Sequence, residues 1–262
     1  MKSRYLRTTD VARGAGVHPN TVRLYETLGF LPPIPRTPSG YRLYTEMHLE
    51  QMRLARLVLH GPWAGRPIRR SGIALIKQGA TGDLEATLAL AHEHRAIVHA
   101  EQAQAEAAAA FLEQWAQGLV PATSINCLNI GQVARLLAIS TDMVRDWERN
   151  GLIEVPRNPE NHYRCYGPLE IGRLRVIRLL RQSGYSTMAI LRMVLQLDQG
   201  QREGLREVLD TPRPDEDILC AADRWLSTLA EQEERAGAII AQVEKMVALS
   251  RRLSPEKHPN IE

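Results

Sequence analysis

Arginine and tyrosine stand on both sides of a turn at two places in the chain. The stretch TVRLYETLGFLPPIPRTPSGYRLYT, residues 21–45, has this layout, and MVRDWERNGLIEVPRNPENHYRCYG, residues 143–167, repeats it. A guanidinium group carries a permanent charge and several hydrogen-bond donors, and tyrosine adds a stiff hydroxyl group. Both groups suit phosphate oxygens and base edges of nucleic acid. The chemistry that this pattern indicates is therefore binding of a polyanion from two sides of a turn.

Charge alternates along the 262 residues, although the formal net charge is only +3. Residues 1–70 contain 12 Lys+Arg and 4 Asp+Glu, whereas residues 81–118 contain 1 and 6. Residues 124–206 contain 12 and 8, whereas residues 207–262 contain 7 and 12. Basic modules of this size suit DNA, and ordinary solvated surface charge is the alternative interpretation.

The chain also repeats itself. When the sequence is shifted by 122 residues, 14 of the 52 positions in the window 6–57 are identical. The identical pairs include Arg23 with Arg145 and Arg42 with Arg164. A period this long does not indicate a solenoid, because solenoid repeats are much shorter. The sequence therefore predicts a duplicated domain.

Each copy follows the same order of predicted elements. Two short helices separated by a tight turn form a helix-turn-helix pattern, and Gly29 or Gly151 ends the second helix. Extended arms at 41–44 and 163–166 then form a wing with the preceding turn. Three further helices are expected in each copy. Their expected bounds are about 46–60, 67–78 and 83–118 in the first copy, and 168–182, 186–197 and 216–253 in the second.

The predicted fold class is mostly α, with duplicated winged helix-turn-helix modules, each followed by a long helix. The last helix has the 4-3 apolar spacing of a coiled coil. The expected domains are a first module, a first long helix of the dimerisation type, a linker, a second module, and a second long helix with a short tail. In the same order, their bounds are 1–80, 81–118, 119–127, 128–210 and 211–262.

This arrangement resembles the MerR-type transcription regulators. In that family a helix-turn-helix ends in Thr-(Ile/Val)-Arg-x-Tyr-Glu-x-x-Gly-Leu, and a wing with Asn-Gly-Tyr-Arg-x-Tyr and a long dimerisation helix follow. The first copy matches in TVRLYETLGF at 21–30 and SGYRLY at 39–44. The second copy departs at Met143, at Trp147 and at Asn161-His162. The resemblance covers nearly the whole chain, twice.

The resemblance implies that the helix beginning at His18 enters the major groove, where Arg23 reaches a guanine edge or a phosphate. The DNA-binding residues that it implies are Thr21, Arg23, Tyr25, Arg36, Tyr41, Arg42, Tyr44, Arg53 and Arg56 in the first copy, and Arg145, Trp147, Arg157, Tyr163, Arg164, Tyr166 and Arg175 in the second. Two alternatives stay open. In the first alternative, Tyr44 and Tyr166 pack the wings onto the helices and do not contact DNA. In the second, the arginines at 53, 56 and 175 are solvated charges on the surface of their helices.

Neither a resident metal nor a cofactor is expected. By resemblance, metal-sensing members carry a cysteine at the start of the long helix and a pair beyond its end. Cys220 stands near such a start, but no cysteine follows residue 250. His92 and His99 share a helix face without the further ligands that would complete a site. Because few residues follow the last helix, a small-molecule effector would bind between helices, near Trp63, Trp115 or Trp225.

Several classes of protein are not expected. The three cysteines are too sparse for a disulfide framework. The sequence has no apolar signal segment and no run of about 18 apolar residues. A cytoplasmic protein without membrane contact is therefore expected. No nucleophile-base arrangement, phosphate loop or HExxH motif is present, so the chain is not expected to be an enzyme.

The expected function is sequence-specific binding of double-stranded promoter DNA. By resemblance, the protein would distort the promoter and so act on RNA polymerase indirectly. One chain would do the work of a dimer and read two unlike half-sites, because the linker 119–127 suits a step from the end of one long helix to an adjacent module. A homodimer with four modules is the rival arrangement. The alternative function is a protein of the same fold that sequesters small molecules and has reduced or lost DNA binding.

Overall fold

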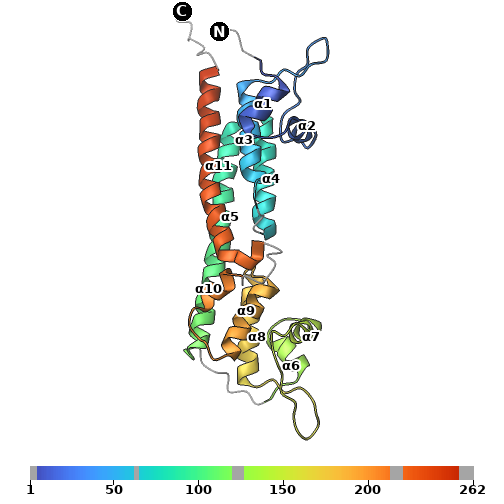
Figure 1. Ribbon diagram of the computed structural model, residues 1–262, viewed down its shortest axis with the longest axis vertical. Helices are drawn as coiled ribbons and strands as arrows, with labels where there is room; N and C mark the ends of the chain where they lie inside the picture. Colours follow the sequence, from blue (N-terminus) through green and yellow to red (C-terminus); the bar gives the residue numbers. More distant parts are fainter. Residues whose placement is uncertain (1–4, 62–64, 120–126, 213–220, 254–262) are drawn as a thin grey trace, which may run out of the picture. The chain divides into compact units, whose positions relative to one another are not determined.

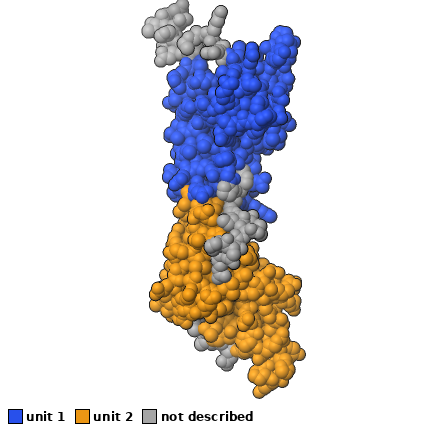
Figure 2. Space-filling model, in the orientation of Figure 1, with its two compact units in different colours: residues 1–99, 231–262 blue, residues 100–230 orange. Residues whose placement is uncertain are grey.

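The computed structural model describes residues 5–61, 65–119, 127–212 and 221–253, and the chain in these ranges is mostly helical (Figure 1). Contacts divide the chain into two compact units, residues 1–99 with 231–262 and residues 100–230 (Figure 2). The division crosses both long helices, α5 (Leu84–Ala116) and α11 (Trp225–Leu253). Each unit therefore contains one module and a part of each long helix. The prediction of a mostly α fold is confirmed.

The first unit begins with the helix-turn-helix formed by α1 (Thr8–Ala15) and α2 (Pro19–Thr27). Gly16 ends α1 in the left-handed region at φ 64°, where glycine has no steric cost. The imidazole Nδ1 of His18 accepts a hydrogen bond from the backbone N–H of Asn20 and so caps α2. The wing follows, held by bridges between Arg36 and Arg42 and between Leu6 and Tyr44. Helices α3 (Glu46–Leu59) and α4 (Gly65–Thr81) complete the module.

The core of this unit includes residues from the far end of the chain. One cluster lies inside the helix-turn-helix and contains Val11, Val22 and Met52. A second cluster joins α3, α4 and the start of α5 to α11, where Ile239, Val243 and Met246 are buried. These three residues belong to the apolar spacing that the sequence shows in the last helix. Part of α11 is thus a structural component of the first module's unit.

A buried carboxylate links α3 to α11 within the first unit. The side chain of Glu50 is 3% exposed and accepts hydrogen bonds from Gln242 Nε2 at 2.7 Å, Lys245 Nζ at 3.0 Å and Arg53 at 2.6 Å. Burial alone would raise the pKa of Glu50, but the hydrogen bonds from Gln242 and Lys245 and the charge of Arg53 outweigh it and lower the pKa. The ionised carboxylate therefore stabilises the folded unit.

We expect the Glu50→Gln variant to lose about 2 kcal/mol of unfolding free energy at pH 7, because charged hydrogen bonds of this kind contribute roughly that amount. A lowered pKa gives stability above the ordinary glutamate pKa that is lost as the pH falls through the folded pKa. The difference between wild type and variant in urea unfolding should therefore shrink between pH 7 and about pH 4. Glu46→Gln, at an exposed position of the same helix, is the control. An equal difference at both pH values would contradict this account.

The second unit repeats the module with α6 (Ile130–Leu136), α7 (Thr141–Arg149), α8 (Pro168–Gln182) and α9 (Thr187–Asp198). Its long-helix parts are held by buried hydrogen bonds. Tyr185 donates its hydroxyl proton to the carbonyl oxygen of Ala105 in α5 at 3.1 Å. Trp225 in α11 donates from Nε1 to the carbonyl oxygen of Ser183 at 2.6 Å.

Two elements of the second unit differ from the sequence prediction. The short helix α10 (Leu205–Asp210) was not predicted, and it packs against α9. The last helix was expected from residue 216, but residues 213–220 lie outside the described ranges. A 3₁₀ turn, η1 (Ala221–Arg224), precedes the start of α11 at Trp225. In the sequence, the 4-3 apolar spacing also begins at Trp225. The spacing therefore marks the first residue of α11 more accurately than the predicted bound of 216.

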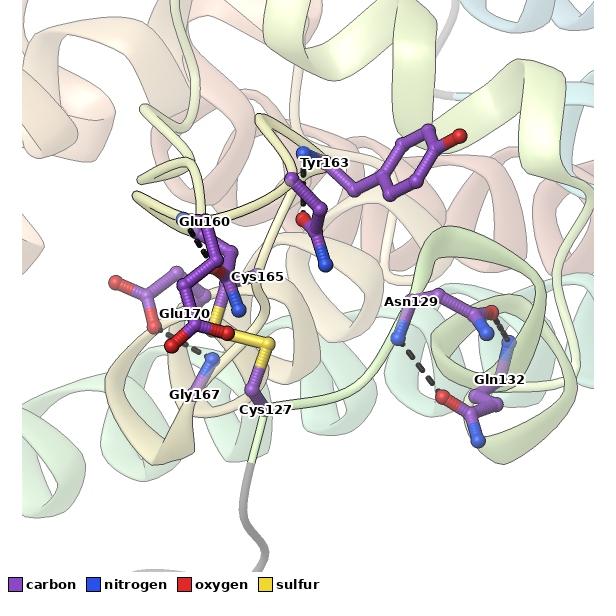
Figure 3. The surroundings of a disulfide bond; sticks show 10 residues. Cys127, Asn129, Gln132, Glu160, Tyr163, Cys165, Gly167 and Glu170 are labelled. Carbon is purple, nitrogen blue, oxygen red and sulfur yellow. Dashed lines mark hydrogen bonds between the residues drawn. A yellow bond between two sulfur atoms is a disulfide. The ribbon is translucent and has the colours of Figure 1, made fainter.

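Cys127 and Cys165 form a disulfide, with Cα atoms 5.0 Å apart (Figure 3). The two residues flank the bridge between Leu128 and Tyr166, where the backbone atoms exchange two hydrogen bonds of 3.0 Å. Three cysteines are too sparse for a disulfide framework, so the sequence did not predict this pair. Their separation of 38 residues concealed the contact, because only the folded wing brings them together.

We expect the double variant Cys127→Ser/Cys165→Ser to melt earlier than the wild type without reductant. Opening a closed loop of 38 residues costs stability through chain entropy, by about 3–4 kcal/mol. Differential scanning calorimetry measures the effect. Adding reductant should lower the wild-type melting temperature and leave that of the double variant unchanged. Equal melting of both proteins without reductant would show that the disulfide does not stabilise the second module.

Candidate DNA-binding surfaces

The first module presents arginine and tyrosine from both α2 and the wing. Arg23 is exposed on α2, and its NH1 donates to the neutral Oδ1 of Asn20 at 3.2 Å. On the wing, Arg36 is exposed, and the ring of Tyr41 is 74% exposed. Thr21 is half-buried at the start of α2. These residues are accessible to a polyanion, and the side chain to which Arg23 donates is uncharged.

In both modules a partly buried ion pair ties the wing to the recognition helix. Arg42 of the first wing donates from Nε to Glu26 in α2 at 2.6 Å. The second module repeats the contact between Arg164 and Glu148 of α7 at 2.8 Å. The hydrogen bond that Arg164 donates to Glu148 raises the pKa of Arg164, so this arginine stays charged. The repeated pair fixes the wing against the helix, a positioning role that the sequence interpretation did not assign to these arginines.

The recognition helix of the second module neutralises its own arginines. Arg145 donates to Asp142 at 2.9 Å, and Arg149 donates to Asp146 at 3.2 Å. The position of Asp142 corresponds to that of Asn20 in the first module, by the shift of 122 residues. An acidic neighbour cancels charge that would otherwise attract phosphates. The two modules therefore present different electrostatic surfaces on the same backbone.

The second wing is also one residue longer. The bridge that closes it joins Arg157 to Arg164, whereas Arg36 and Arg42 are one residue closer in sequence. His162 occupies the left-handed region at φ 59°, in the part of the wing where the first module has Gly40 at φ 85°. Arg157 donates to the carbonyl oxygen of His162 at 3.0 Å. Tyr163 stays 74% exposed, as Tyr41 does in the first wing.

Three residues that were predicted to contact DNA are core residues instead. Tyr44 and Tyr166 are 0% exposed, and Trp147 is 5% exposed. Burial raises the pKa of both tyrosines. The prediction is wrong for these residues, and the alternative that Tyr44 and Tyr166 pack the wings onto the helices is the observed role. Tyr25 is half-buried and packs edge-on against Phe30, with ring centroids 5.6 Å apart.

The arginines of α3 that were predicted to contact the DNA backbone contact the protein backbone. Arg53 donates from Nε to the carbonyl oxygen of Gly14 at 3.0 Å, and Arg56 donates to that of Ala15. Both carbonyl groups lie in the last turn of α1, where the helix dipole favours a cation. Arg175, the counterpart of Arg53 in α8, is half-buried.

The tryptophans proposed as ligand-lining residues have different surroundings. Trp115 lines a cavity of about 520 Å³ in the second unit, together with Phe111 and Gly172. Trp225 is 3% exposed and uses its N–H group within the core. Trp63 lies outside the described residues. Of the two described tryptophans, Trp115 is the one that lines a cavity.

Two histidines of α5, His94 and His99, have partners within the first unit. His94 is buried beside Ser71, with Nδ1 and Oγ 2.7 Å apart, and burial lowers the pKa of His94. His99 contacts Glu233 at 2.7 Å. Within the described ranges, no three His, Cys, Asp or Glu side chains gather where they could hold a metal ion. Cys220 lies outside these ranges. No helix of the described chain has the length and apolar character to cross a membrane.

A repeated winged helix-turn-helix with exposed arginine on its first recognition helix and wing defines a DNA-binding regulatory protein. Residues 7–44 match the MerR family regulatory protein family, and residues 128–197 match the MerR HTH family regulatory protein family. A probable heavy metal-dependent transcriptional regulator of Haemophilus influenzae is 36% identical over 120 residues, which cover 46% of this chain and 80% of that protein. The chain belongs to the MerR family of transcription regulators.

Two further relatives are consistent with this assignment. Heavy metal-dependent transcription regulator 2 of Rhizobium meliloti is 30% identical over 112 residues, covering 43% of this chain and 67% of that protein. The transcriptional regulator CueR of Escherichia coli is 37% identical over 51 residues, covering 20% of this chain and 38% of that protein. No solved structure matches this chain.

Proposed function

We propose that this chain regulates transcription by binding promoter DNA as a single-chain pseudo-dimer. The observation that supports the proposal is the composition of the two units. The far part of α11 belongs to the unit of the first module, and the far part of α5 belongs to that of the second. In MerR-type dimers, the antiparallel long helices place the end of one helix beside the partner's DNA-binding module. A duplicated chain can supply both helices itself.

The two modules would read unlike half-sites. The first recognition helix offers Arg23 with a neutral neighbour, whereas the second offers arginines paired with acidic residues. An arginine with an uncharged neighbour can read guanine, whereas an arginine that is paired with a carboxylate offers less to a base edge or a phosphate. The preferred operator is therefore asymmetric. The modules would bend and twist the promoter between them and so act on RNA polymerase indirectly. Deforming the DNA in this way costs a few kcal/mol of free energy.

Selection of binding sequences from genomic fragments, followed by a mobility-shift titration, tests this function. The expected result is a preferred duplex with two unlike half-sites and an affinity that falls steeply with salt, because several phosphates are neutralised. Recovery of no preferred duplex at moderate salt would contradict the proposal. That outcome would favour the alternative function, a protein that sequesters small molecules. The carboxylates on α7 and the cavity beside Trp115 are consistent with this alternative.

A further inference from the structure

A strongly cationic cavity lies in the first unit, between the end of α1, the middle of α3 and the side of α11. Its volume is about 590 Å³, within the range of sites for small molecules. Arg13, Arg53, Arg56 and Arg235 line it, with His60 and Gln242. None of the lining residues carries a carboxylate. We propose that this cavity binds a small molecule bearing a diphosphate or triphosphate group.

The acidic residue beside the cavity, Glu50, balances the charge of only one lining arginine, Arg53. The carboxylate of Glu50 is buried and already accepts hydrogen bonds from Arg53, Gln242 and Lys245. Arg13 and Arg235 form no ion pair within the described part of the chain. Four guanidinium groups around one cavity repel one another, and the repulsion falls when an anion lies between them. Guanidinium groups also match phosphate oxygens in geometry, with two parallel donors each.

Glycine residues give the guanidinium groups room to lie against the backbone. Gly16 occupies the left-handed region at φ 64°, and a Cβ atom there would collide with the guanidinium of Arg56. Gly61, at φ 92°, stands in the same relation to Arg235. Backbone fixation reduces the freedom that these side chains lose on binding a ligand. The cavity is thus pre-organised by residues from three separate segments.

The second module lacks this construction. By the shift of 122 residues, Arg135 corresponds to Arg13, but Leu136 and Ala138 stand where the first module has Gly14 and Gly16. Leu136 is 43% exposed, so its side chain adds apolar bulk beside the end of α6. The duplication thereby provides an internal control. Arg13, Arg53 and Arg56 have arginine counterparts in the second module, at 135, 175 and 178, whereas the two glycines have none.

The cavity is placed to bind a free ligand rather than the DNA backbone. In Figure 1, α2 and α11 lie on opposite sides of α3, and Arg235 and Gln242 belong to α11. A ligand that joins Arg13 of the module to Arg235 of the long helix would hold the module against that helix. Because the wing and α2 belong to the same module, ligand binding would restrict their position. The inference does not require that the chain bind DNA.

Isothermal titration of the full chain with inorganic pyrophosphate tests the proposal. We expect one binding event per chain, and Arg13→Gln or Arg235→Gln should raise the dissociation constant by roughly tenfold or more, because each removes a charged hydrogen-bond donor. Arg135→Gln, the matched change in the second module, should leave it unchanged. Thermal melting confirms that each variant is folded. Absence of binding, or equal losses in Arg13→Gln and Arg135→Gln, would overturn the proposal.

A second titration separates the two sources of phosphate. The chain is first saturated with its selected duplex, or with a random duplex if selection yields none, and pyrophosphate is then added. Pyrophosphate binding that persists on the duplex complex, at the same or a shifted affinity, supports a site for a free ligand. Displacement of pyrophosphate by the duplex would assign the cavity to the DNA contact and would contradict the proposal. If the chain binds no duplex, the first titration still decides whether the cavity binds phosphate.

Discussion

Replacing Arg23 by alanine is expected to lower the affinity for the selected duplex by about 10- to 100-fold, the usual effect of losing one good arginine contact. Arg145→Ala should cost clearly less. The reason is electrostatic, because Arg23 donates to the neutral Asn20, whereas Arg145 is paired with Asp142 at 2.9 Å. An arginine that already has a carboxylate partner gains less from a phosphate or a guanine. Mobility-shift titrations at fixed salt measure both variants.

The duplication supplies a reciprocal control for this difference. Asp142→Asn gives the second module the residue that the first has at the equivalent position, and Asn20→Asp does the opposite. We expect Asp142→Asn to raise the affinity by roughly threefold, because an exposed ion pair of this kind is worth up to about 1 kcal/mol. Asn20→Asp should lower it. Equal losses for Arg23→Ala and Arg145→Ala, with no effect of either exchange, would contradict the proposed inequality of the modules.

Val243→Asp is expected to unfold much of the first unit and to abolish DNA binding by its module. Val243 lies in α11, is 0% exposed, and packs in the cluster that contains Phe30, Leu54 and Leu75. An unpaired carboxylate at this position would have to be buried or protonated, at a cost that is a large fraction of the stability of a domain. The change lies more than 160 residues along the chain from the module that it should damage.

Ala241→Asp is the matched control, because Ala241 is exposed two residues earlier on the same helix. It adds the same charge to α11 without burying it, so the melting temperature should change little. Hydrogen exchange of the amide groups in α1 to α3 distinguishes local unfolding from a general loss of structure. If Val243→Asp leaves the first module protected against exchange, α11 is not a component of its core.

Local patterns made much of the fold predictable from the sequence. The paired helices, the wings, and the helices α3 and α8 follow from glycine positions and apolar spacing within each copy, since these signals lie within a few residues of the structure they specify. The 4-3 spacing in the last helix correctly indicated buried residues, including Ile239 and Met246. The spacing alone could not name the partner, which includes α3 and α4 as well as another long helix.

The site was harder to predict, because it depends on contacts between distant residues. Arginine and tyrosine in the wings looked equivalent in sequence, yet Tyr41 is exposed and Tyr44 is fully buried. Alternation along an extended arm explains this difference, since residues an odd number apart point to opposite faces. The acidic neighbours of Arg145 and Arg149 were visible in the sequence at a spacing of three, which places them on one face of a helix. The cationic cavity was not visible, because Arg235 reaches it from the other end of the chain.

The central claim is that one chain provides both modules and both long helices of a MerR-type assembly. Sedimentation equilibrium at micromolar concentration is the test of this arrangement. It gives the mass of the free protein and the mass of its complex with the selected duplex. We expect a free mass near 29.4 kDa, the mass of a single chain, and one chain per duplex. A stable free mass of twice that value, with two chains on each duplex, would show that the modules are paired between chains and would contradict the account.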